Sequence, residues 1–454
     1  LGSLTATPVF AASQLPNTLA EAYILIDMTT GEVLAEKNSE EALYPASTTK
    51  IMTALLAIEN LDLDASWTAD REVYATGGSR LTLINGEVCN IKDVLYASMI
   101  KSANDGSVFL AKAVAGSTEA FVAMMNERAL ALGCVNTCFK NPSGLHEEGH
   151  YSCAADLGRI ALCAMQNPVF RDVVRTPSYV MRETNLSGER TVQNTNLMLY
   201  DCTEANRVTV NGVYRYCKYD GCTGIKTGYT PEAQGCLVSS AERNGTKLLC
   251  VVLKSSTLGR FSDSIGLLDW GFENFRTEQV MSAGLDMGVA SVKKGSVRTV
   301  GVLSSEDVIL TLPAEASGSL IRTEVSIMEN VPAPVFKGQE IGELTIYEGG
   351  IEIGRYPLLA AADVPEGGFL SNFGIEDALA EKILRIGAIV LGSLLLLAIL
   401  FFAVIFYIAY KRKKKRAAAR AARRKAKAEA EERRRQEWMR RFDSRYQMSR
   451  EDEE

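Results

Sequence analysis

The chain has 454 residues, of which 47% are hydrophobic, so it is too apolar for a disordered protein and long enough for two or three domains. Its net charge of −6 conceals a segregation, because 18 of the 49 basic residues but only 9 of the 55 acidic residues follow residue 410. The tail therefore carries +9 and the rest of the chain −15, which indicates that the two parts meet different surroundings.

The first twelve residues are typical of the remnant of a signal peptide. The stretch LGSLTATPVFAAS has no initiating methionine, and Val9-Phe10-Ala11 fits the small-residue pattern before a cleavage site, with Ala11 or Ala12 as the last residue removed. A leader without a targeting role is the alternative. A cleaved signal peptide would mean that the domain after it is exported.

Residues 18–275 have the pattern of one domain that mixes helices and strands. Alternation from Glu21 predicts a hairpin, and Pro45 and Ser47 precede an apolar helix that we expect to begin at about Ser47. Helices that lie between two sets of strands predict an α/β sandwich in which helices cover an antiparallel sheet. Further helices are predicted at 91–115, 117–133, 152–166 and 262–275, and strands at 235–243 and 246–256.

Beyond Thr277 the composition changes to short β-branched runs, so residues 277–365 are predicted to form a small all-β domain. Residues 366–385 would link it to the segment 386–410, which has 25 residues without a charge. At ~1.5 Å per residue this segment exceeds the ~30 Å hydrocarbon core of a bilayer. We therefore predict a transmembrane helix, with a buried core helix as the alternative.

The basic run Lys411–Arg416 follows the predicted span at once. By the positive-inside rule, residues 411–454 form a basic cytoplasmic tail and the domains before the span are extracellular. The expected protein is thus a single-pass protein of the cell membrane. The Ala, Arg, Glu and Lys content of the tail favours a helix, which either only sets the topology or also contacts anionic lipid headgroups.

All ten cysteines lie between Cys89 and Cys250. An exported location permits disulfides, and two candidate pairs are Cys134 with Cys138 and Cys217 with Cys222. Buried thiols that behave as small hydrophobes are the alternative. No C-x-x-C spacing occurs, so a zinc ribbon is not predicted.

Three short motifs occur in the order of the penicillin-recognising serine enzymes. Each motif alone is weak, because Ser291-Val292-Lys293-Lys294 also reads S-x-x-K in a predicted strand or turn. The three together, in order and at matching local structure, predict a catalytic site. The motifs are Ser47-Thr48-Thr49-Lys50, Ser102-Ala103-Asn104 and Lys226-Thr227-Gly228.

A catalytic serine needs a base within hydrogen-bond reach, because its hydroxyl is a weak nucleophile. Lys50 lies three residues along the same helix face and can be that base only if it is neutral; burial and the nearby cation Lys226 would both lower its pKa. Ser102 can relay a proton, and Asn104 can orient Lys50 and the substrate amide.

The third motif, Lys226-Thr227-Gly228, precedes an apolar strand and is predicted to bind substrate. Gly228 would let an extended peptide approach the sheet edge as an added strand. The backbone N–H groups of Ser47 and Tyr229 would then form an oxyanion hole.

Four longer stretches resemble the low-molecular-mass penicillin-binding proteins, the exported serine D-alanyl-D-alanine carboxypeptidases of bacteria. These stretches are LYPASTTKIMTALLAIE, SANDGSVFLAKAVAG, FKNPSGLHEEGHYSCAADLGRIA and GIKTGYTPEAQGCLVSSAERNG. The similarity covers about residues 18 to 275, and the β-rich segment after it is similar to the C-terminal domain of the family. The resemblance implies the α/β (α+β) fold of the penicillin-recognising serine hydrolases.

The resemblance also implies the reaction, which is removal of the terminal D-alanine from peptidoglycan pentapeptide stems. Ser47 would form the acyl-enzyme with Lys50 as base, and Lys226 and Thr227 would bind the carboxylate end. β-Lactams would acylate Ser47 as covalent inhibitors. We expect no cofactor, no metal and no nucleic-acid partner.

Two features depart from the family. Many members carry an arginine where Asn194-Thr195-Asn196 has Thr195, which leaves more of the carboxylate recognition to Lys226 and Thr227. Members often attach to the membrane through an amphipathic C-terminal helix, whereas this chain has a full span and a basic tail.

Other activities stay open from the sequence. A β-lactamase would need an added glutamate and water for deacylation, and none is identified. A transpeptidase or endopeptidase differs only in the acyl acceptor. A wall-binding or scaffolding protein with an idle site is the alternative from another class, and the intact motif set argues against it.

The string HEEGH, His146–His150, matches the zinc-protease pattern H-E-x-x-H only in its letters. Pro142 and Gly144 mark a turn before it, Gly149 weakens a helix by ~1 kcal/mol, and the next helix is predicted to begin at Ser152. The chain has two histidines, so a third metal ligand would have to be an acidic residue or a cysteine. We predict a solvated loop for most of the string and a substrate-binding role for His150, by its match to the GHYS segment of the family.

Overall fold

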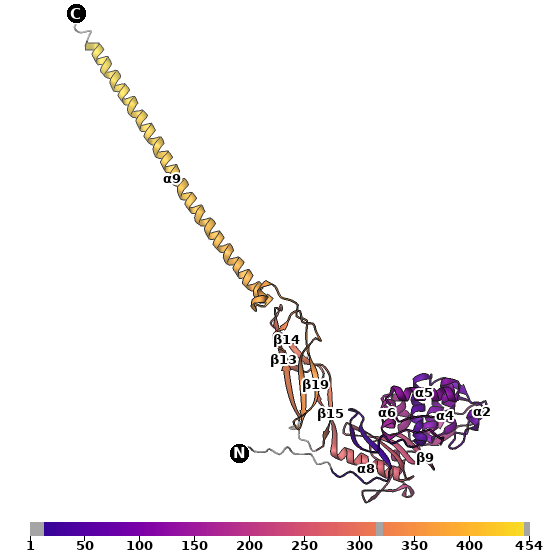
Figure 1. Cartoon of the computed structure of the whole chain (residues 1–454). Coiled ribbons are helices and arrows are strands. Elements are labelled where there is room, and N and C mark those ends of the chain that lie inside the picture. Colours follow the sequence, from indigo (N-terminus) through magenta and orange to yellow (C-terminus); the bar gives the residue numbers. More distant parts are fainter. Residues whose placement is uncertain (1–12, 315–320, 449–454) are drawn as a thin grey trace, which may run out of the picture. The chain divides into compact units, whose positions relative to one another are not determined.

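The computed structural model describes residues 13–314 and 321–448, with side chains described as far as residue 442 (Figure 1). The predicted signal-peptide remnant, residues 1–12, lies outside the described residues. The chain divides into two compact units. Residues 1–287, 303–326 and 342–358 form the first, and residues 288–302, 327–341 and 359–454 form the second.

The first unit is built on a five-stranded antiparallel sheet of order β2-β1-β11-β10-β9. Side chains alternate between two cores, so that Ile24 and Ile26 point to one face of the sheet and Tyr23 and Leu25 to the other. The strands are β1 (Ala22–Asp27), β2 (Val33–Lys37), β9 (Cys222–Thr230), β10 (Gln234–Arg243) and β11 (Thr246–Ser255).

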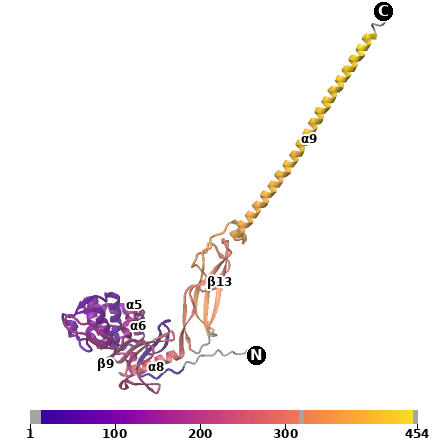
Figure 2. The ribbon, with the colours of Figure 1, turned by 180° about the vertical axis from the view of Figure 1, so that it is seen from behind.

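Helices cover both faces of this sheet, which confirms the predicted sandwich. Figure 2 shows α5 and α6 grouped on one side of the domain and α8 (Gly259–Asn274) on the other. The first group packs on Ile24 and Ile26, and α8 packs on Leu25. The first group comprises α1 (Lys50–Asn60), α3 (Ile91–Lys101), α4 (Asn104–Ala115), α5 (Thr118–Ala131), α6 (Ala154–Gln166) and α7 (Pro168–Arg175).

Several helix boundaries differ from the prediction, such as that of α8, which begins at Gly259 rather than at Ser262, and two of the differences have a clear structural cause. The helix expected at 91–115 is two helices, because Ser102 takes a left-handed backbone with φ of 64° and ends α3. The helix expected from Ser152 begins at Ala154, because the backbone of Ser152 pairs with Leu43 and Cys153 becomes the cap residue.

Short elements complete this unit. Apart from the 3-10 turn at Ala46–Thr49, where a helix was expected to begin at about Ser47, none of them was predicted. They are α2 (Arg71–Ala75), the 3-10 helices at Ala46–Thr49, Leu197–Leu199 and Glu204–Asn206, and the hairpins β3 (Ser66–Thr68) with β4 (Val88–Asn90), β5 (Ser178–Met181) with β6 (Arg190–Gln193), and β7 (Val208–Val210) with β8 (Val213–Arg215).

The β-rich region predicted after Thr277 is present. One antiparallel pair joins β12 (Phe275–Met281) to β15 (Val308–Pro313). A six-stranded sheet has the order β16-β18-β19-β14-β13-β17. Its strands are β13 (Asp286–Lys293), β14 (Thr299–Ser304), β16 (Ile321–Ile327), β17 (Val331–Pro332), β18 (Glu340–Glu348) and β19 (Ile351–Ala360).

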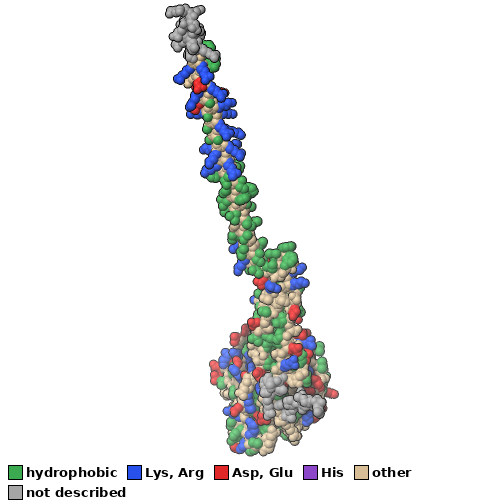
Figure 3. Space-filling view, turned by 90° about the vertical axis from the view of Figure 1, so that its left-hand side faces the viewer, with side chains coloured by type: hydrophobic (Ala, Val, Ile, Leu, Met, Phe, Trp, Pro, Cys, Tyr) green, Lys and Arg blue, Asp and Glu red, His purple; other side chains and the backbone are tan. Residues whose placement is uncertain are grey.

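The C-terminal part is one continuous helix, α9 (Asp377–Met448), of 72 residues. It begins inside the predicted linker and runs through the predicted span into the basic tail. Large apolar side chains between Ile386 and Tyr410 are exposed, and Figure 3 shows this hydrophobic band followed by Lys and Arg side chains. By its length and hydropathy α9 is a candidate membrane anchor.

The cysteines are free thiols in the structure, including the two candidate pairs of the sequence analysis. Six of the ten are buried, and Cys202 is the exposed one. Burial raises the pKa of Cys89, Cys134 and Cys153 to about 12. These side chains therefore behave as small hydrophobes in the core.

A thiol titration is expected to find ten reactive cysteines in denaturant and about one, Cys202, that reacts quickly in the folded protein. The measurement is the absorbance of an aromatic disulfide reagent with and without denaturant, under conditions free of reductant. A Cys202→Ser variant should lose the fast phase. A denatured count below ten would mean that disulfides form.

Candidate active site

The turn before α1 places Ser47 and Lys50 together. Ala46 to Thr49 form one turn of 3-10 helix, and Ala46 has a φ of 47° that turns the chain into it. The Lys50 Nζ lies 2.9 Å from the Ser47 Oγ. The predicted contact between nucleophile and base is therefore present in the geometry.

The surroundings of Lys50 suit a neutral amine. Its side chain is 1% exposed, and its Nζ donates to the Asn104 Oδ1 at 2.8 Å and to the Ser143 carbonyl oxygen at 2.6 Å. A neutral amine has two N–H bonds and one lone pair, so these two acceptors leave the lone pair for the Ser47 hydroxyl. Burial, followed by the charge of Lys226, holds the pKa of Lys50 well below its usual range.

A tight loop supplies the Ser143 carbonyl. The Asn141 Oδ1 accepts from the backbone N–H of Ser143 and of Gly144, at 3.2 and 2.8 Å. Gly144 has a φ of 77°, and a Cβ there would lie 1.8 Å from the carbonyl oxygen of Ala46. A side chain at Gly144 would therefore push the loop away from the nucleophile turn, and the carbonyl would move away from Lys50.

The corner between α3 and α4 carries the second motif. Ser102 ends α3 in its left-handed conformation, and Asn104 begins α4. Asn104 is held by its backbone N–H, which donates to the Ser79 carbonyl at 2.7 Å, and by its Nδ2, which donates to the Gly77 carbonyl at 2.9 Å. Its Oδ1 is thereby aimed at Lys50.

The third motif lies inside strand β9 rather than before a strand, as the sequence analysis had it. A Cβ on Gly228 would lie 3.0 Å from the Pro45 carbonyl oxygen and 3.2 Å from the Ser47 backbone nitrogen. A side chain at residue 228 would therefore force one of these two backbones to shift by a few tenths of an ångström. Lys226 is buried, and burial followed by the charge of Arg260 lowers its pKa to about 7.

Arg260, at the start of α8, is a site residue that the sequence analysis missed. Its Nη1 donates to the carbonyl oxygen of Gly228 at 2.7 Å, and burial lowers its pKa. Its Nε is buried without a hydrogen-bond partner among the described residues. The only sequence signal was an arginine that opens a helix after a strand, 32 residues beyond Gly228.

Thr195 is the residue at which the sequence analysis noted a departure from the family. Its Oγ1 lies 2.6 Å from the Thr227 Oγ1, and its backbone N–H donates to the Ile100 carbonyl at 3.1 Å. One hollow is thus lined by Thr195, Thr227 and Arg260, which belong to three separate segments of the chain.

That hollow has a volume of about 280 Å³. Lys50 and Lys226 are buried beyond its surface, and His150 is not in its lining. Six of the predicted site residues line it: Ser47, Ser102, Asn104, Thr227, Gly228 and Tyr229.

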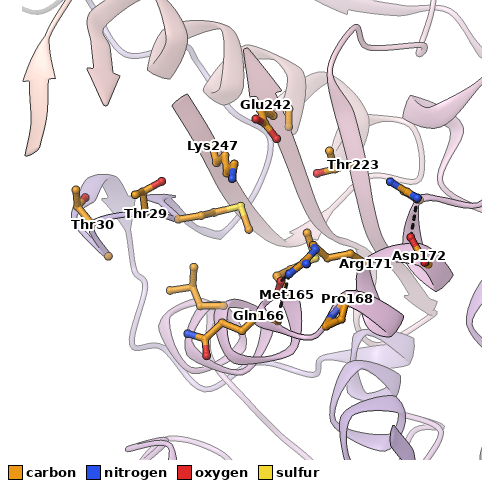
Figure 4. Close-up of a pocket in the computed structure, with 15 residues that line it drawn as sticks. Thr29, Thr30, Met165, Gln166, Pro168, Arg171, Asp172, Thr223, Glu242 and Lys247 are labelled. Carbon is orange, nitrogen blue, oxygen red and sulfur yellow. Dashed lines mark hydrogen bonds and ion pairs between the residues drawn. The ribbon is translucent and has the colours of Figure 1, made fainter. Parts of the chain in front are cut away.

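A larger hollow of about 830 Å³ lies at the other end of β9, where Thr223 is part of its lining (Figure 4). Two of its three basic side chains are already engaged. Arg171 donates to the carbonyls of Met165 and Gln166, and Arg175 pairs with Asp172 at 2.6 Å. The smaller hollow, which Ser47 lines, is therefore the candidate active site.

His150 lies behind the nucleophile turn and is 2% exposed. The backbone N–H of Lys140 donates to its Nδ1 at 3.1 Å, so Nε2 carries the proton and donates to the Thr49 Oγ1 at 2.9 Å. Burial, followed by the charges of His146, Lys140 and Lys50, lowers the pKa of His150 to about 4.

The free energy of unfolding should therefore depend on the protonation of His150. Between pH 6.5 and about 4 the unfolded chain binds a proton that the folded chain does not, so stability falls as the pH falls, by about 3 kcal/mol. Urea unfolding of the native chain and of His150→Gln should show a difference in stability that shrinks over this range. A difference in stability that stays constant over this range would contradict the expectation.

The HEEGH string is not a metal site in the structure. His146 is exposed and its ring meets Tyr44, whereas both ring nitrogens of His150 are used in hydrogen bonds. The residues 146–149 form no helix. Another group, Glu40, Cys153 and Asp156, has metal-ligand spacing, but Arg159 already pairs with both of its carboxylates.

A serine beside a buried lysine, a Ser-x-Asn corner and a Lys-Thr-Gly strand define the class of serine hydrolases that penicillins acylate. The family model described as D-alanyl-D-alanine carboxypeptidase matches residues 9–257, and the model described as the C-terminal domain of penicillin-binding protein 5 matches residues 275–366. The chain belongs to this carboxypeptidase family and is a serine-type peptidase.

Individual relatives agree with the family match. The D-alanyl-D-alanine carboxypeptidase DacF of Bacillus subtilis (strain 168) is 34% identical, over 78% of this chain and 87% of the relative. Penicillin-binding protein 5 of Haemophilus influenzae has a similar structure, with a TM-score of 0.65, 26% identity, and coverage of 78% of this chain and 100% of that chain. A mutant of the Streptomyces K15 DD-transpeptidase is 31% identical, with a TM-score of 0.50 over 57% of this chain and 99% of that chain.

Proposed function

We propose that the protein removes the terminal D-alanine from peptidoglycan pentapeptide stems through an acyl-enzyme on Ser47. The observation that carries the proposal is the Lys50 amine, whose two N–H bonds have acceptors and whose remaining position faces the Ser47 Oγ. The family membership supports the same substrate class.

Acylation would follow from this geometry. Lys50 takes the proton of Ser47, whose oxygen attacks the carbonyl carbon of the penultimate D-alanine. The N–H groups of Ser47 and Tyr229 stabilise the negative oxygen. The C–N bond then breaks, and the proton reaches the leaving D-alanine nitrogen from Lys50, directly or by way of Ser102. Water attacks the ester in the second half and regenerates Ser47.

We propose that the substrate carboxylate is read by Thr227 and Arg260 together with Lys226. Thr195 completes a pair of hydroxyls with Thr227 and supplies a donor where other members have an arginine. Arg260 supplies the permanent charge, because the pKa of Lys226 lies near neutrality.

His150 is proposed to act through Thr49 rather than by touching substrate. Its Nε2 proton holds the Thr49 hydroxyl, which lies between the nucleophile and its base in the sequence. As a neutral donor at physiological pH it adds no charge beside Lys50.

The proposed location follows from α9 and the basic tail. The helix would span the cell membrane once, with the catalytic domain outside and residues 411–454 in the cytoplasm. In that position the catalytic domain would face the cell wall. The enzyme would then act in peptidoglycan biosynthesis and in the control of cell shape. Exported chains reach such a place through a signal peptide, for which residues 1–12 are the candidate.

Two measurements on the full chain in detergent test the function. A fluorescent penicillin should form a covalent adduct that mass spectrometry maps to the peptide that contains Ser47. D-Alanine release from a pentapeptide should be catalysed without an amine acceptor. Product that appears only when an acceptor amine is supplied would replace hydrolysis by transpeptidation, the reaction in the name of the similar Streptomyces enzyme.

A further inference from the structure

A third hollow, of about 400 Å³, adjoins the active-site hollow. Three segments connect these two hollows: Tyr44 precedes Ser47 by three residues, one loop carries both Leu145 and Gly149, and the turn after β9 carries Thr230 and Glu232. The lining of the third hollow is Ala42, Leu43, Tyr44, Gly149, Tyr151, Glu232, Ala233 and Lys254.

Two tyrosines give this hollow aromatic surfaces. Tyr44 is 39% exposed and Tyr151 is 37% exposed, although both line a concave surface. The Tyr44 ring meets the His146 ring edge to face, with centroids 4.7 Å apart. We call the hollow between these rings the Tyr44–Tyr151 pocket. Its aromatic walls suit an aliphatic chain or a cation.

The charge of the Tyr44–Tyr151 pocket comes from Glu232. Among residues 13–314 and 321–442, no lysine or arginine forms an ion pair with this exposed carboxylate, which is hydrogen-bonded to the Thr230 side chain and lies near the charge of His146. The lysine of the lining, Lys254, pairs instead with Glu21 at 2.6 Å. The pocket therefore presents one carboxylate that forms no ion pair with a lysine or arginine and that can receive a cation from a ligand.

The proposed reaction fixes the direction in which the bound stem peptide extends away from Ser47. The terminal carboxylate lies at Thr227, and the scissile carbonyl lies at the N–H of Tyr229. The earlier residues of the stem therefore run antiparallel to β9, past Thr230 and toward Glu232, at ~3.4 Å per residue. The residue before the two D-alanines arrives beside the Tyr44–Tyr151 pocket.

We propose that this pocket binds the side chain of that residue when it is a diamino acid such as lysine. The methylene groups would lie between Tyr44 and Tyr151, and the terminal ammonium would pair with Glu232. The inference rests on the proposed function, because the direction of the stem depends on it. The proposal assigns a preference for one stem residue, which the three sequence motifs do not predict.

Two peptides test the proposal with the full chain. One is Nα-acetyl-L-lysyl-D-alanyl-D-alanine, which has a free side-chain amine, and the other is its Nα,Nε-diacetyl form. The native enzyme should release D-alanine from the first with a kcat/KM about tenfold higher, which corresponds to about 1.4 kcal/mol. Glu232→Gln should reduce this preference to about one. Equal values in the native enzyme, or a preference retained by Glu232→Gln, would overturn the proposal.

A matched control is Glu148→Gln, which removes an exposed carboxylate on the neighbouring loop that is not in the pocket lining, and which should keep the tenfold preference. Protection against fluorescent penicillin by the two peptides gives the same comparison without turnover. If neither peptide released D-alanine, the proposed function would fail. The order of protection would still decide whether the pocket prefers the free amine.

Discussion

Ser47→Ala is expected to abolish the covalent penicillin adduct and to lower D-alanine release by ~10³-fold or more, because among the described residues Ser47 supplies the hydroxyl that is hydrogen-bonded to the Lys50 amine. Substrate binding should persist, since the backbone N–H of residue 47 and the carboxylate-reading groups are unchanged. The measurements are gel fluorescence after penicillin labelling and steady-state D-alanine release.

The chain contains its own control for this variant. Ser291 begins a second S-x-x-K string in β13, where its Oγ accepts from the Asn330 backbone N–H. Ser291→Ala should keep both activities at the native level. An adduct that survives in Ser47→Ala, or disappears in Ser291→Ala, would place the nucleophile elsewhere.

Lys50→Met should lower the rate of penicillin acylation by ~10²- to 10⁴-fold, the range that a positioned general base contributes. Methionine fills a similar volume but cannot take the Ser47 proton, and it leaves the acceptors on Asn104 and Ser143 without their donor. Lys50→Arg should be similarly slow, because a guanidinium stays protonated. The second-order rate constant of acylation, measured from pH 5 to 9, separates the variants.

The sign of the pH dependence follows from the lowered pKa of Lys50. The neutral form acts as base, so the native rate should fall as the pH drops and Lys50 is protonated, and Lys50→Met should lose this acid limb. Circular dichroism would verify that both variants are folded. A native-like rate in Lys50→Met at pH 7 would exclude Lys50 as the base.

The sequence predicted the elements that depend on local spacing. Ser47 and Lys50 are one helical turn apart, so their contact needs no knowledge of the rest of the chain. The alternating strands and apolar helices likewise gave the sandwich correctly. The split at Ser102 was missed because a left-handed serine has no distinctive local pattern.

Contacts between distant residues could not be predicted in the same way. The Ser143 carbonyl oxygen accepts a hydrogen bond from Lys50, which lies 93 residues earlier in the chain. Every residue has a backbone carbonyl, so the residue type at position 143 could not predict this contact. Arg260 reaches Gly228 only because α8 packs beside β11 and β10. The candidate disulfides failed for a related reason, since short spacing between cysteines says nothing about the direction of their side chains.

The close passage of β9 along the nucleophile turn has a consequence for drug resistance. The nearest atoms to Gly228 across the cleft are the Pro45 carbonyl oxygen, the Ala46 Cβ and the Ser47 backbone nitrogen, so a side chain at Gly228 would have to push the two segments apart. Selection under β-lactams should therefore spare this contact and act on exposed side chains at the mouth of the cleft, such as Tyr229 and Leu145. Changes there could favour the natural peptide over the inhibitor while the acylation machinery stays intact.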